Sequence, residues 1–413
     1  MIETPLTGLV LSGGGARAAY QVGVLRAIAR LRRDALGARS RVMSPFGVIV
    51  GTSAGAINAA ALACHADRFE ASVEVIAKVW ANFSADQVYR ADALGMISSG
   101  ARWLTMLSAG WVIARWRRAR PRSLLDNEPL AELLARMVPL ERLPLMLAQR
   151  QLHALAVTAS SYTTGEHYTF YSAAVPIEPW QRSQRVAQAT RLTVNHLLAS
   201  SAIPFVFPAT RLEDAASGGW FGDGSMRQTA PLSPAIHLGA QRLLIIGAGR
   251  MYEPGQRRVI DTGYPSLAQI AGHAMSSIFL DALAVDIERM RRINRTLALL
   301  PEYALADTPL RPLEALVISP SQRIDDIASR HVQNLPPAVR ALLRGVGVGG
   351  TGASARGSAL ASYLLFEAPF TRELIALGEA DTLARSDEVL SFFGWRRPRA
   401  RPGEGPAIDI ELP

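Results

Sequence analysis

The chain has 413 residues, 49% of them hydrophobic and 19% charged, so it can bury one large core or two ordinary ones. This composition excludes an intrinsically disordered protein, and the absence of 18 uninterrupted apolar residues argues against a transmembrane helix. The formal net charge is +9, and arginine supplies every basic residue except Lys78. Such a balance favours anionic partners, either nucleic acid or an acidic lipid surface.

The first predicted strand, residues 8–11, leads into a glycine-rich loop, Gly13-Gly14-Gly15-Ala16-Arg17, and then into a predicted helix. Glycines at the start of a helix expose backbone N–H groups, so the loop is suited to hold an anion. A Walker loop would close with Gly-Lys-Ser or Gly-Lys-Thr, and a Rossmann fingerprint would need a glycine at Ala18. Both nucleotide interpretations therefore fit less well than an oxyanion hole.

The second predicted strand, residues 47–50, leads into Gly51-Thr52-Ser53-Ala54-Gly55 and an apolar helix that contains Cys64. Small residues around a serine permit the sharp turn that exposes its hydroxyl at the positive end of the following helix. The pattern predicts that Ser53 is a nucleophile, with an ordinary tight turn as the alternative. We expect Cys64 to be a small buried core residue.

An insertion of mixed helices follows, and it contains an apolar stretch over residues 103–114 that is too short to span a bilayer. This stretch contains Trp103 and Trp111. It is preceded by Arg102 and followed by Arg115, Arg117, Arg118, Arg120 and Arg122. Indoles and guanidinium groups in this arrangement suit a segment lying in an anionic membrane interface. A helix packed on the core with a solvated basic end is the alternative.

The rest of the chain continues the alternation of strands and helices, which predicts α/β layers around a largely parallel sheet. The further predicted strands are residues 152–158, 242–247 and 315–318, and a long helix is predicted over 266–300. We expect a flexible surface loop over residues 345–357 and a disordered basic tail from 396. The first residues lack a basic region and a cleavable apolar segment, so we expect a cytoplasmic protein.

A nucleophilic serine needs a base, and the chain offers histidines at 65, 153, 167, 196, 237, 273 and 331. The Ser-acid-His order of α/β-hydrolases points to His237, His273 or His331, none of which has a distinctive setting. Asp223 stands out instead, because flanking glycines let its carboxylate approach another backbone closely. A solvated turn aspartate is the alternative.

Taken together, these motifs resemble the patatin-like phospholipase family. Its signatures are a glycine-rich oxyanion loop ending in Arg or Lys, a G-x-S-x-G serine, and an Asp-Gly-Gly or Asp-Gly-Ala aspartate that works without histidine. This chain carries them in the family's order over about residues 7–240, with a further match at 199–208. It departs from the family pattern at Ala18, where glycine is usual, and at Ser225, where Gly or Ala is usual.

The resemblance implies a three-layer α/β/α fold with a central, mostly parallel sheet and a helical C-terminal extension. The implied division is a catalytic domain over 7–240, with a helical insertion at about 65–150, an extension over 241–395 packed on it, and the tail 396–413.

The resemblance also implies that Ser53 and Asp223 form a catalytic dyad that cleaves carboxylic esters of phospholipids or related acyl lipids through an acyl-enzyme. Oxyanion donors would come from Gly13, Gly14, Gly15 and Ala54, and supporting residues are Arg17, Gly51, Gly55 and Gly224. Arg17 would steady the glycine loop or meet a lipid phosphate. No cofactor, metal or nucleic acid is expected. Peripheral contact with the anionic inner membrane surface follows only if the segment 103–114 lies in the interface and is not packed on the core. The alternatives are a non-catalytic lipid-binding protein, an acyltransferase and a thioesterase.

Overall fold

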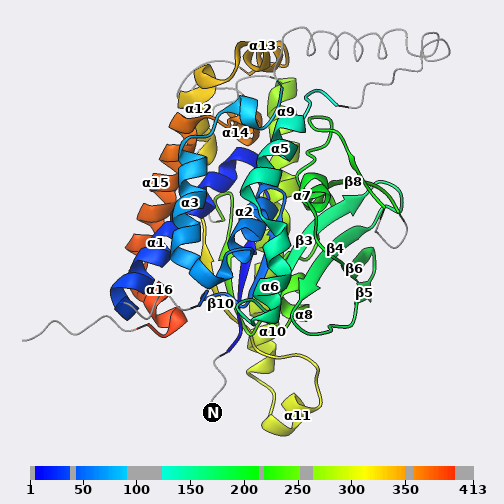
Figure 1. Ribbon diagram of the computed structural model, residues 1–413, viewed down its shortest axis with the longest axis vertical. Helices are drawn as coiled ribbons and strands as arrows, with labels where there is room; N and C mark the ends of the chain where they lie inside the picture. Colours follow the sequence, from blue (N-terminus) through cyan, green and yellow to red (C-terminus); the bar gives the residue numbers. More distant parts are fainter. Residues whose placement is uncertain are drawn as a thin grey trace, which may run out of the picture.

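The computed structural model describes residues 5–37, 43–90, 123–213, 218–251, 264–348 and 357–395. Figure 1 shows these residues as a central sheet with helices packed around it. Alternate residues of the strands belong to two separate hydrophobic clusters, one on each face of the sheet. The predicted arrangement of helix, sheet and helix layers is therefore confirmed.

The parallel part of the sheet has the strand order β10-β9-β1-β2-β3, and each neighbouring pair in it is parallel. These strands are β1 (Thr7–Leu11), β2 (Val48–Thr52), β3 (Ala154–Ser161), β9 (Arg242–Ile246) and β10 (Glu314–Ile318). Each coincides within a few residues with a strand predicted from the sequence. Because parallel strands end at the same edge, the loops after β1 and β2 lie close together.

The other part of the sheet continues from β3 and was not predicted. Its strands are β4 (His167–Ala173), β5 (Gln181–Arg182), β6 (Arg185–Ala189), β7 (Thr210–Leu212) and β8 (Gly219–Asp223). Strand β3 pairs antiparallel with both β4 and β8, while β4 pairs parallel with β6. The pairing of β8 with β3 brings the end of β8 to the centre of the sheet.

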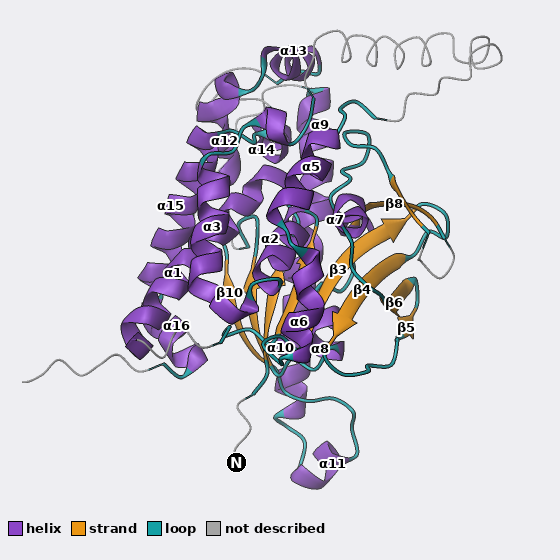
Figure 2. Cartoon of the chain, viewed as in Figure 1, coloured by secondary structure: helices purple, strands orange, loops and turns teal. Residues whose placement is uncertain are grey.

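Most of the helices cover one face of the sheet, where α1 packs against both α3 and α15 (Figure 2). The N-terminal helices of this group are α1 (Ala19–Leu36), α2 (Ala54–Ala63), α3 (Phe69–Ala81), α5 (Glu128–Met137), α6 (Leu143–Ala148) and α7 (Val194–Ser200). The C-terminal ones are α12 (Ile324–His331), α13 (Pro337–Gly345), α14 (Ser358–Leu364), α15 (Ala368–Ala384) and α16 (Ser386–Phe393). Cys64, which directly follows α2, is buried as predicted.

The opposite face is covered by α8 (Ser233–His237) and by the second half of a long helix that confirms the one predicted over 266–300 and whose first half packs against α14. It comprises α9 (Leu267–Ser276), a π-helical turn (Ser277–Asp281) and α10 (Ala282–Leu297), and α11 (Glu302–Ala306) follows it. By length and composition alone, Leu267–Leu297 could cross a membrane. Its residues Leu283, Ile287 and Met290 pack in the core cluster of this face.

Several predicted features fall outside the described residues. They are the interfacial segment with Trp103, Trp111, Arg115, Arg117 and Arg118, most of the loop predicted over 345–357, and the tail from 396. The predictions for these segments therefore stay predictions.

Candidate active site

Ser53 occupies the turn between β2 and α2, where its backbone has φ 56° and ψ −131°. A positive φ is unusual for a residue with a side chain, so the surrounding structure must hold this strained turn. The residue is buried, with 1% of its surface exposed. Its hydroxyl donates a hydrogen bond to Oδ2 of Asp223 over 2.6 Å. The turn thus presents Ser53 Oγ to a carboxylate that lies 170 residues further along the chain.

Close packing around the turn explains the glycines on either side of the serine. A Cβ on Gly51 would lie 2.5 Å from Cα of Ala56, and a Cβ on Gly55 would lie 2.5 Å from the carbonyl oxygen of Leu11. Neither contact can be relieved without moving backbone. Since Leu11 ends β1, the glycine at 55 also lets the serine turn approach the loop that follows β1.

Asp223 is the last residue of β8 and is completely buried. Its Oδ1 accepts a hydrogen bond from the backbone N–H of Ser225 over 2.9 Å. A Cβ on Gly224 would lie 2.4 Å from the carbonyl oxygen of Thr158, so this turn also packs tightly on β3. Burial raises the pKa of Asp223 to about 6, although hydrogen bonds from Ser53 and Ser225 act in the opposite direction. The carboxyl is thus ionised at neutral pH but is a stronger base than an exposed aspartate.

The segment at the end of α7 contacts both the serine and the aspartate. The backbone N–H of Ser53 donates to Oγ of Ser200 over 2.9 Å. The backbone N–H of Asp223 donates to the carbonyl oxygen of Ala202 over 3.0 Å. Sequence reasoning noted the match of 199–208 to the family but gave Ser200 no role. The two hydrogen bonds fix the serine and the aspartate relative to each other.

The glycine-rich loop after β1 leads into a short 3-10 helix, η1 (Gly15–Ala18), that opens α1. Gly15 has φ 55°, and a Cβ there would lie 2.3 Å from the carbonyl oxygen of Tyr363. A glycine is therefore required at this position both by the backbone conformation and by the space available. Gly15, Ser53 and Ala54 line the same cavity, so the structure brings together the predicted cradle and the predicted nucleophile.

Arg17 is buried, with 2% of its surface exposed, and its guanidinium group is held by the C-terminal helices. Nε donates to Oγ of Ser362 over 2.7 Å, and Nη2 donates to Oδ1 of Asp325 over 2.6 Å. Nη2 also donates to the carbonyl oxygen of Ala359, and the group lies 4.0 Å from the ring centre of Tyr363. Of the two roles predicted for Arg17, this geometry favours steadying the loop over contact with a lipid phosphate.

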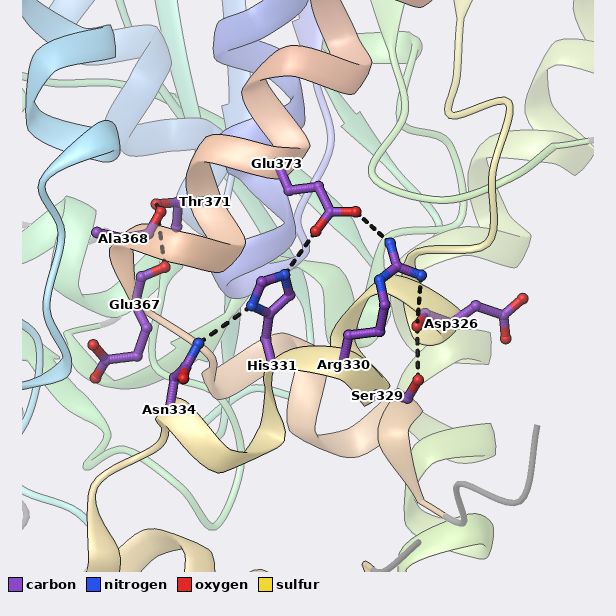
Figure 3. A network of polar contacts seen from close by, with 9 residues as sticks. All are labelled: Asp326, Ser329, Arg330, His331, Asn334, Glu367, Ala368, Thr371 and Glu373. Atoms are coloured by element: carbon purple, nitrogen blue, oxygen red, sulfur yellow. Dashed lines mark hydrogen bonds and ion pairs between the residues drawn. The ribbon is translucent and has the colours of Figure 1, made fainter. Parts of the chain in front are cut away.

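The three histidines that a Ser-acid-His order would suggest have other surroundings. Figure 3 shows His331 between Glu373 and Asn334, with Nε2 of the ring 2.7 Å from the carboxylate. Nδ1 of His237 lies 2.8 Å from a backbone oxygen of its own helix, α8. His273 is exposed on α9. The described structure thus places a carboxylate, and not one of these imidazoles, beside the serine hydroxyl.

The cavity beside Ser53 is almost entirely apolar and lies among α2, α3, α5 and the end of α7. The side chains along it include Ile57, Ile76, Val79, Leu130, Leu133, Leu134, Ile203, Phe207 and Phe366. Polar groups are concentrated near the serine, where Asn58 and Ser201 also line the wall. This cavity has a volume of about 80 Å³, so it can admit the end of a hydrocarbon chain beside Ser53 Oγ.

Comparison with known protein families agrees with this geometry. The family described as Patatin-like phospholipase matches residues 9–236, which is more than half of the chain. The chain belongs to the patatin-like phospholipase family. It is therefore a lipid acyl hydrolase by class, and the family predicted from the motifs is confirmed. No curated protein matches the sequence.

Among solved structures, the patatin-like chain is similar to VipD from Legionella pneumophila, at 13% identity and a TM-score of 0.31, covering 90% of this chain and 67% of that one. It is similar to human GIVD cytosolic phospholipase A2 in complex with methyl gamma-linolenyl fluorophosphonate, at 13% identity and a TM-score of 0.40, covering 94% and 59%. A third match is to the complex of SpcU with ExoU from Pseudomonas aeruginosa, at 16% identity and a TM-score of 0.26, covering 95% and 70%. This chain thus spans 59% to 70% of the length of these three chains.

The two departures from the patatin-like pattern differ in their surroundings. Ala18 is fully buried in η1, where its methyl group is accommodated. The hydroxyl of Ser225 is also buried, and it lies 2.3 Å from the position that a Cβ on Gly13 would take. This hydroxyl lowers the pKa of Asp223, yet it makes no hydrogen bond of regular geometry within the described structure. Ser225 thus lies between the aspartate and the glycine loop.

The described residues include no group of three or more His, Cys, Asp or Glu side chains that could hold a metal ion.

Proposed function

We propose that this patatin-like chain hydrolyses carboxylic ester bonds of phospholipids or related acyl lipids through a dyad of Ser53 and Asp223. The observation that carries the proposal is the 2.6 Å hydrogen bond from Ser53 Oγ to Asp223 Oδ2, made by two buried residues. A buried carboxylate with a raised pKa is able to accept the serine proton near neutral pH. The apolar cavity beside the serine supports a substrate with an acyl chain.

In the first step, Asp223 takes the hydroxyl proton while Ser53 Oγ attacks the ester carbonyl carbon. The negative charge that develops on the carbonyl oxygen is held by backbone N–H groups of the loop Gly13 to Gly15 and of Ala54. The alcohol leaves with the proton from Asp223, and the acyl group remains on the serine. One oxyanion donor is worth about 3 kcal/mol of barrier, so damage to this loop lowers turnover more than binding.

In the second step, Asp223 removes a proton from water, which attacks the acyl-serine and releases the fatty acid. The serine hydroxyl then recovers its proton from the aspartate. If another acceptor reaches the acyl-enzyme before water, the same two residues catalyse acyl transfer. A thioester substrate would enter the same cycle.

The experiment that tests this function is product analysis on defined phospholipids, lysophospholipids, triacylglycerols and acyl thioesters, for the wild type and Ser53→Ala. Free fatty acid released only by the wild type supports a hydrolase. Acyl chains found on an added alcohol or lipid would assign an acyltransferase. A folded protein that neither turns over these substrates nor reacts with a fluorophosphonate probe would be a lipid-binding protein with a silent site.

We further propose that the enzyme works in the cytoplasm at an anionic membrane surface. The proposal rests on the net charge of +9 and on the tryptophans and arginines between residues 103 and 118. The net positive charge would then attract the protein to acidic lipids rather than to nucleic acid.

A further inference from the structure

A second and larger cavity lies on the face of the sheet opposite to the one that α2 covers. It has a volume of about 680 Å³ and is formed by α8, by α10 and by the segment 309–313. Its side chains Leu232, Met290 and Leu313 belong to the core cluster of that face. The cavity beside Ser53 is lined by side chains of the core cluster on the other face. Cavities of roughly 300 to 1,000 Å³ are typical of small-molecule sites.

The walls of this second cavity combine hydrocarbon surface with positive charge. The apolar lining is Ala230, Leu232, Ile236, Met290, Ile293, Leu310 and Leu313. The charged lining consists of Arg185, Arg289 and Arg311 against one acid, Asp286. The three arginines therefore exceed the acid by two charges within the described lining.

Both oxygens of the single carboxylate, Asp286, have partners within the chain. Oδ2 of Asp286 accepts a hydrogen bond from the backbone N–H of Leu232 over 2.9 Å, and Oδ1 lies 3.4 Å from Nη1 of Arg289. Asp286 has 7% of its surface exposed, so it offers little negative charge to the cavity. The acid thus belongs to the wall; its charge acts on Arg185 as well as on Arg289, and the three arginines still exceed it by two charges.

The remaining arginines differ in how firmly they are held. Arg311 Nη2 donates to the carbonyl oxygens of Ile236 and Ala240, over 3.3 and 3.1 Å, which fixes its guanidinium group at the rim. Arg185 is half-buried in the wall, and its guanidinium group makes no hydrogen bond or ion pair with the described part of the chain. A half-buried guanidinium group with free donors is an incomplete arrangement that a carboxylate or phosphate would complete.

We propose that this cavity binds an amphiphile with one anionic group, the carboxylate or phosphate meeting Arg185 and Arg311 and the hydrocarbon part lying on Met290, Ile293 and Leu310. A plain inorganic anion would leave the apolar wall wet, and a neutral lipid would leave the arginines unpaired. The site is separate from the dyad, so its occupation does not depend on whether Ser53 is catalytic.

The test measures binding of laurate, dodecyl phosphate and inorganic phosphate by calorimetry to protein whose catalytic cavity has first been treated with an alkyl fluorophosphonate. Laurate and dodecyl phosphate should each bind, and inorganic phosphate should not. Arg185→Gln should weaken laurate binding by about tenfold or more, because a charge-assisted hydrogen bond is lost. The matched control is Arg291→Gln, which removes the same charge from the exposed side of α10 and should bind laurate as the wild type does.

Equal laurate affinity in Arg185→Gln and Arg291→Gln would overturn the proposal. Inorganic phosphate binding as tightly as dodecyl phosphate would also overturn it, because the apolar wall would then play no part. Ile293→Ser provides a second variant, since it should weaken the dodecyl ligands. The laurate affinities of the two arginine variants can be compared without labelling Ser53. This comparison therefore still tests the second cavity if the catalytic proposal fails.

Discussion

Ser200 Oγ accepts a hydrogen bond from the backbone N–H of Ser53 over 2.9 Å, and both residues are buried. The N–H group belongs to the residue with the strained backbone, where φ is 56°. The hydroxyl therefore supports the conformation that points Ser53 Oγ at Asp223.

Ser200→Ala should leave that N–H buried without an acceptor, which costs about 1 to 3 kcal/mol of folding free energy. We also expect kcat to fall while KM changes little, because the turn that positions the nucleophile is loosened. Urea unfolding and steady-state kinetics on a soluble ester measure the two effects. Ser329→Ala is the control, since its buried hydroxyl donates to a backbone oxygen of α12, away from the site. Equal kcat values for the two variants would contradict the role of Ser200.

The pH dependence of activity should follow the ionisation of Asp223. Burial raises its pKa to about 6, and only the ionised carboxylate can take the serine proton. The rate constant kcat/KM on a soluble ester should therefore fall as the pH drops through about 6. A profile that stays flat down to pH 5 would show that another group is the base.

The same carboxyl should also make folding stability depend on pH. Its pKa is higher in the folded protein, about 6, than its ordinary value of 3.8, so the folded state binds the proton more tightly. The stabilisation is present below the lower value and is lost as the pH rises from about 4 to 6. Two pKa units correspond to about 3 kcal/mol. The free energy of unfolding of Asp223→Asn, measured relative to that of the wild type, should therefore be up to about 3 kcal/mol higher at pH 7 than at pH 4. Urea unfolding at both pH values measures this difference. The same stability difference at both pH values would contradict the raised pKa of Asp223.

Replacement of Ser225 should move the acid limb of the activity profile. Its hydroxyl lowers the pKa of Asp223, so Ser225→Ala removes that effect and the midpoint should shift upward. The backbone N–H of residue 225 still reaches Oδ1, so the turn should remain in place. The kcat/KM profiles of the wild type, Ser225→Ala and Ser225→Gly decide the matter, and an unchanged midpoint in both variants would refute the expectation.

Arg17 should couple the glycine loop to the C-terminal helices. Arg17→Lys keeps the charge but loses the fork that meets Ser362 and Asp325, so we expect a loss of about 1.5 to 3 kcal/mol of stability and a lower kcat. Arg242→Gln breaks a more exposed pair with Glu314 and should cost under about 1 kcal/mol. Thermal unfolding and kinetics measure both. If the two variants behave alike, Arg17 has no special role in the loop.

The amount of structure that the sequence could predict differs between the two parts of the sheet. Strands β1, β2, β3 and β9 are buried on both faces, and the edge strand β10 carries an apolar run over 315–318, so all five appear as short apolar runs. Strand β4 alternates polar and aromatic residues, β5 and β7 have only two and three residues, and β8, with the sequence Gly-Trp-Phe-Gly-Asp, is not an apolar run. Strands β4 and β8 pair with β3, β5 pairs with β6 and β7 pairs with β8, and no local pattern encodes these contacts.

The site shows the same division. Ser53, the glycine loop and Asp223 each carry a local signature because a strained or tightly packed backbone needs small residues. The role of Ser200 and the partner of Arg17 arise only when distant segments meet, since Arg17 and Asp325 are 308 residues apart. Such pairs cannot be read from one sequence.

The membrane prediction concerns Trp103 and Trp111, which lie outside the described residues. Changing both to serine should weaken binding to vesicles containing anionic lipid, because interfacial indoles are lost. Vesicle sedimentation at constant salt measures this, with neutral vesicles as the comparison. Unchanged binding by a folded variant would assign the segment to the protein core.

The most direct test of the dyad is the rate of ester hydrolysis by Asp223→Asn beside His237→Ala, His273→Ala and His331→Ala. We predict that the aspartate variant loses activity by about a thousandfold or more, as expected for removal of a general base, while each histidine variant keeps its activity. Substantial activity in Asp223→Asn, together with its loss in one of the histidine variants, would contradict the dyad and assign a conventional triad.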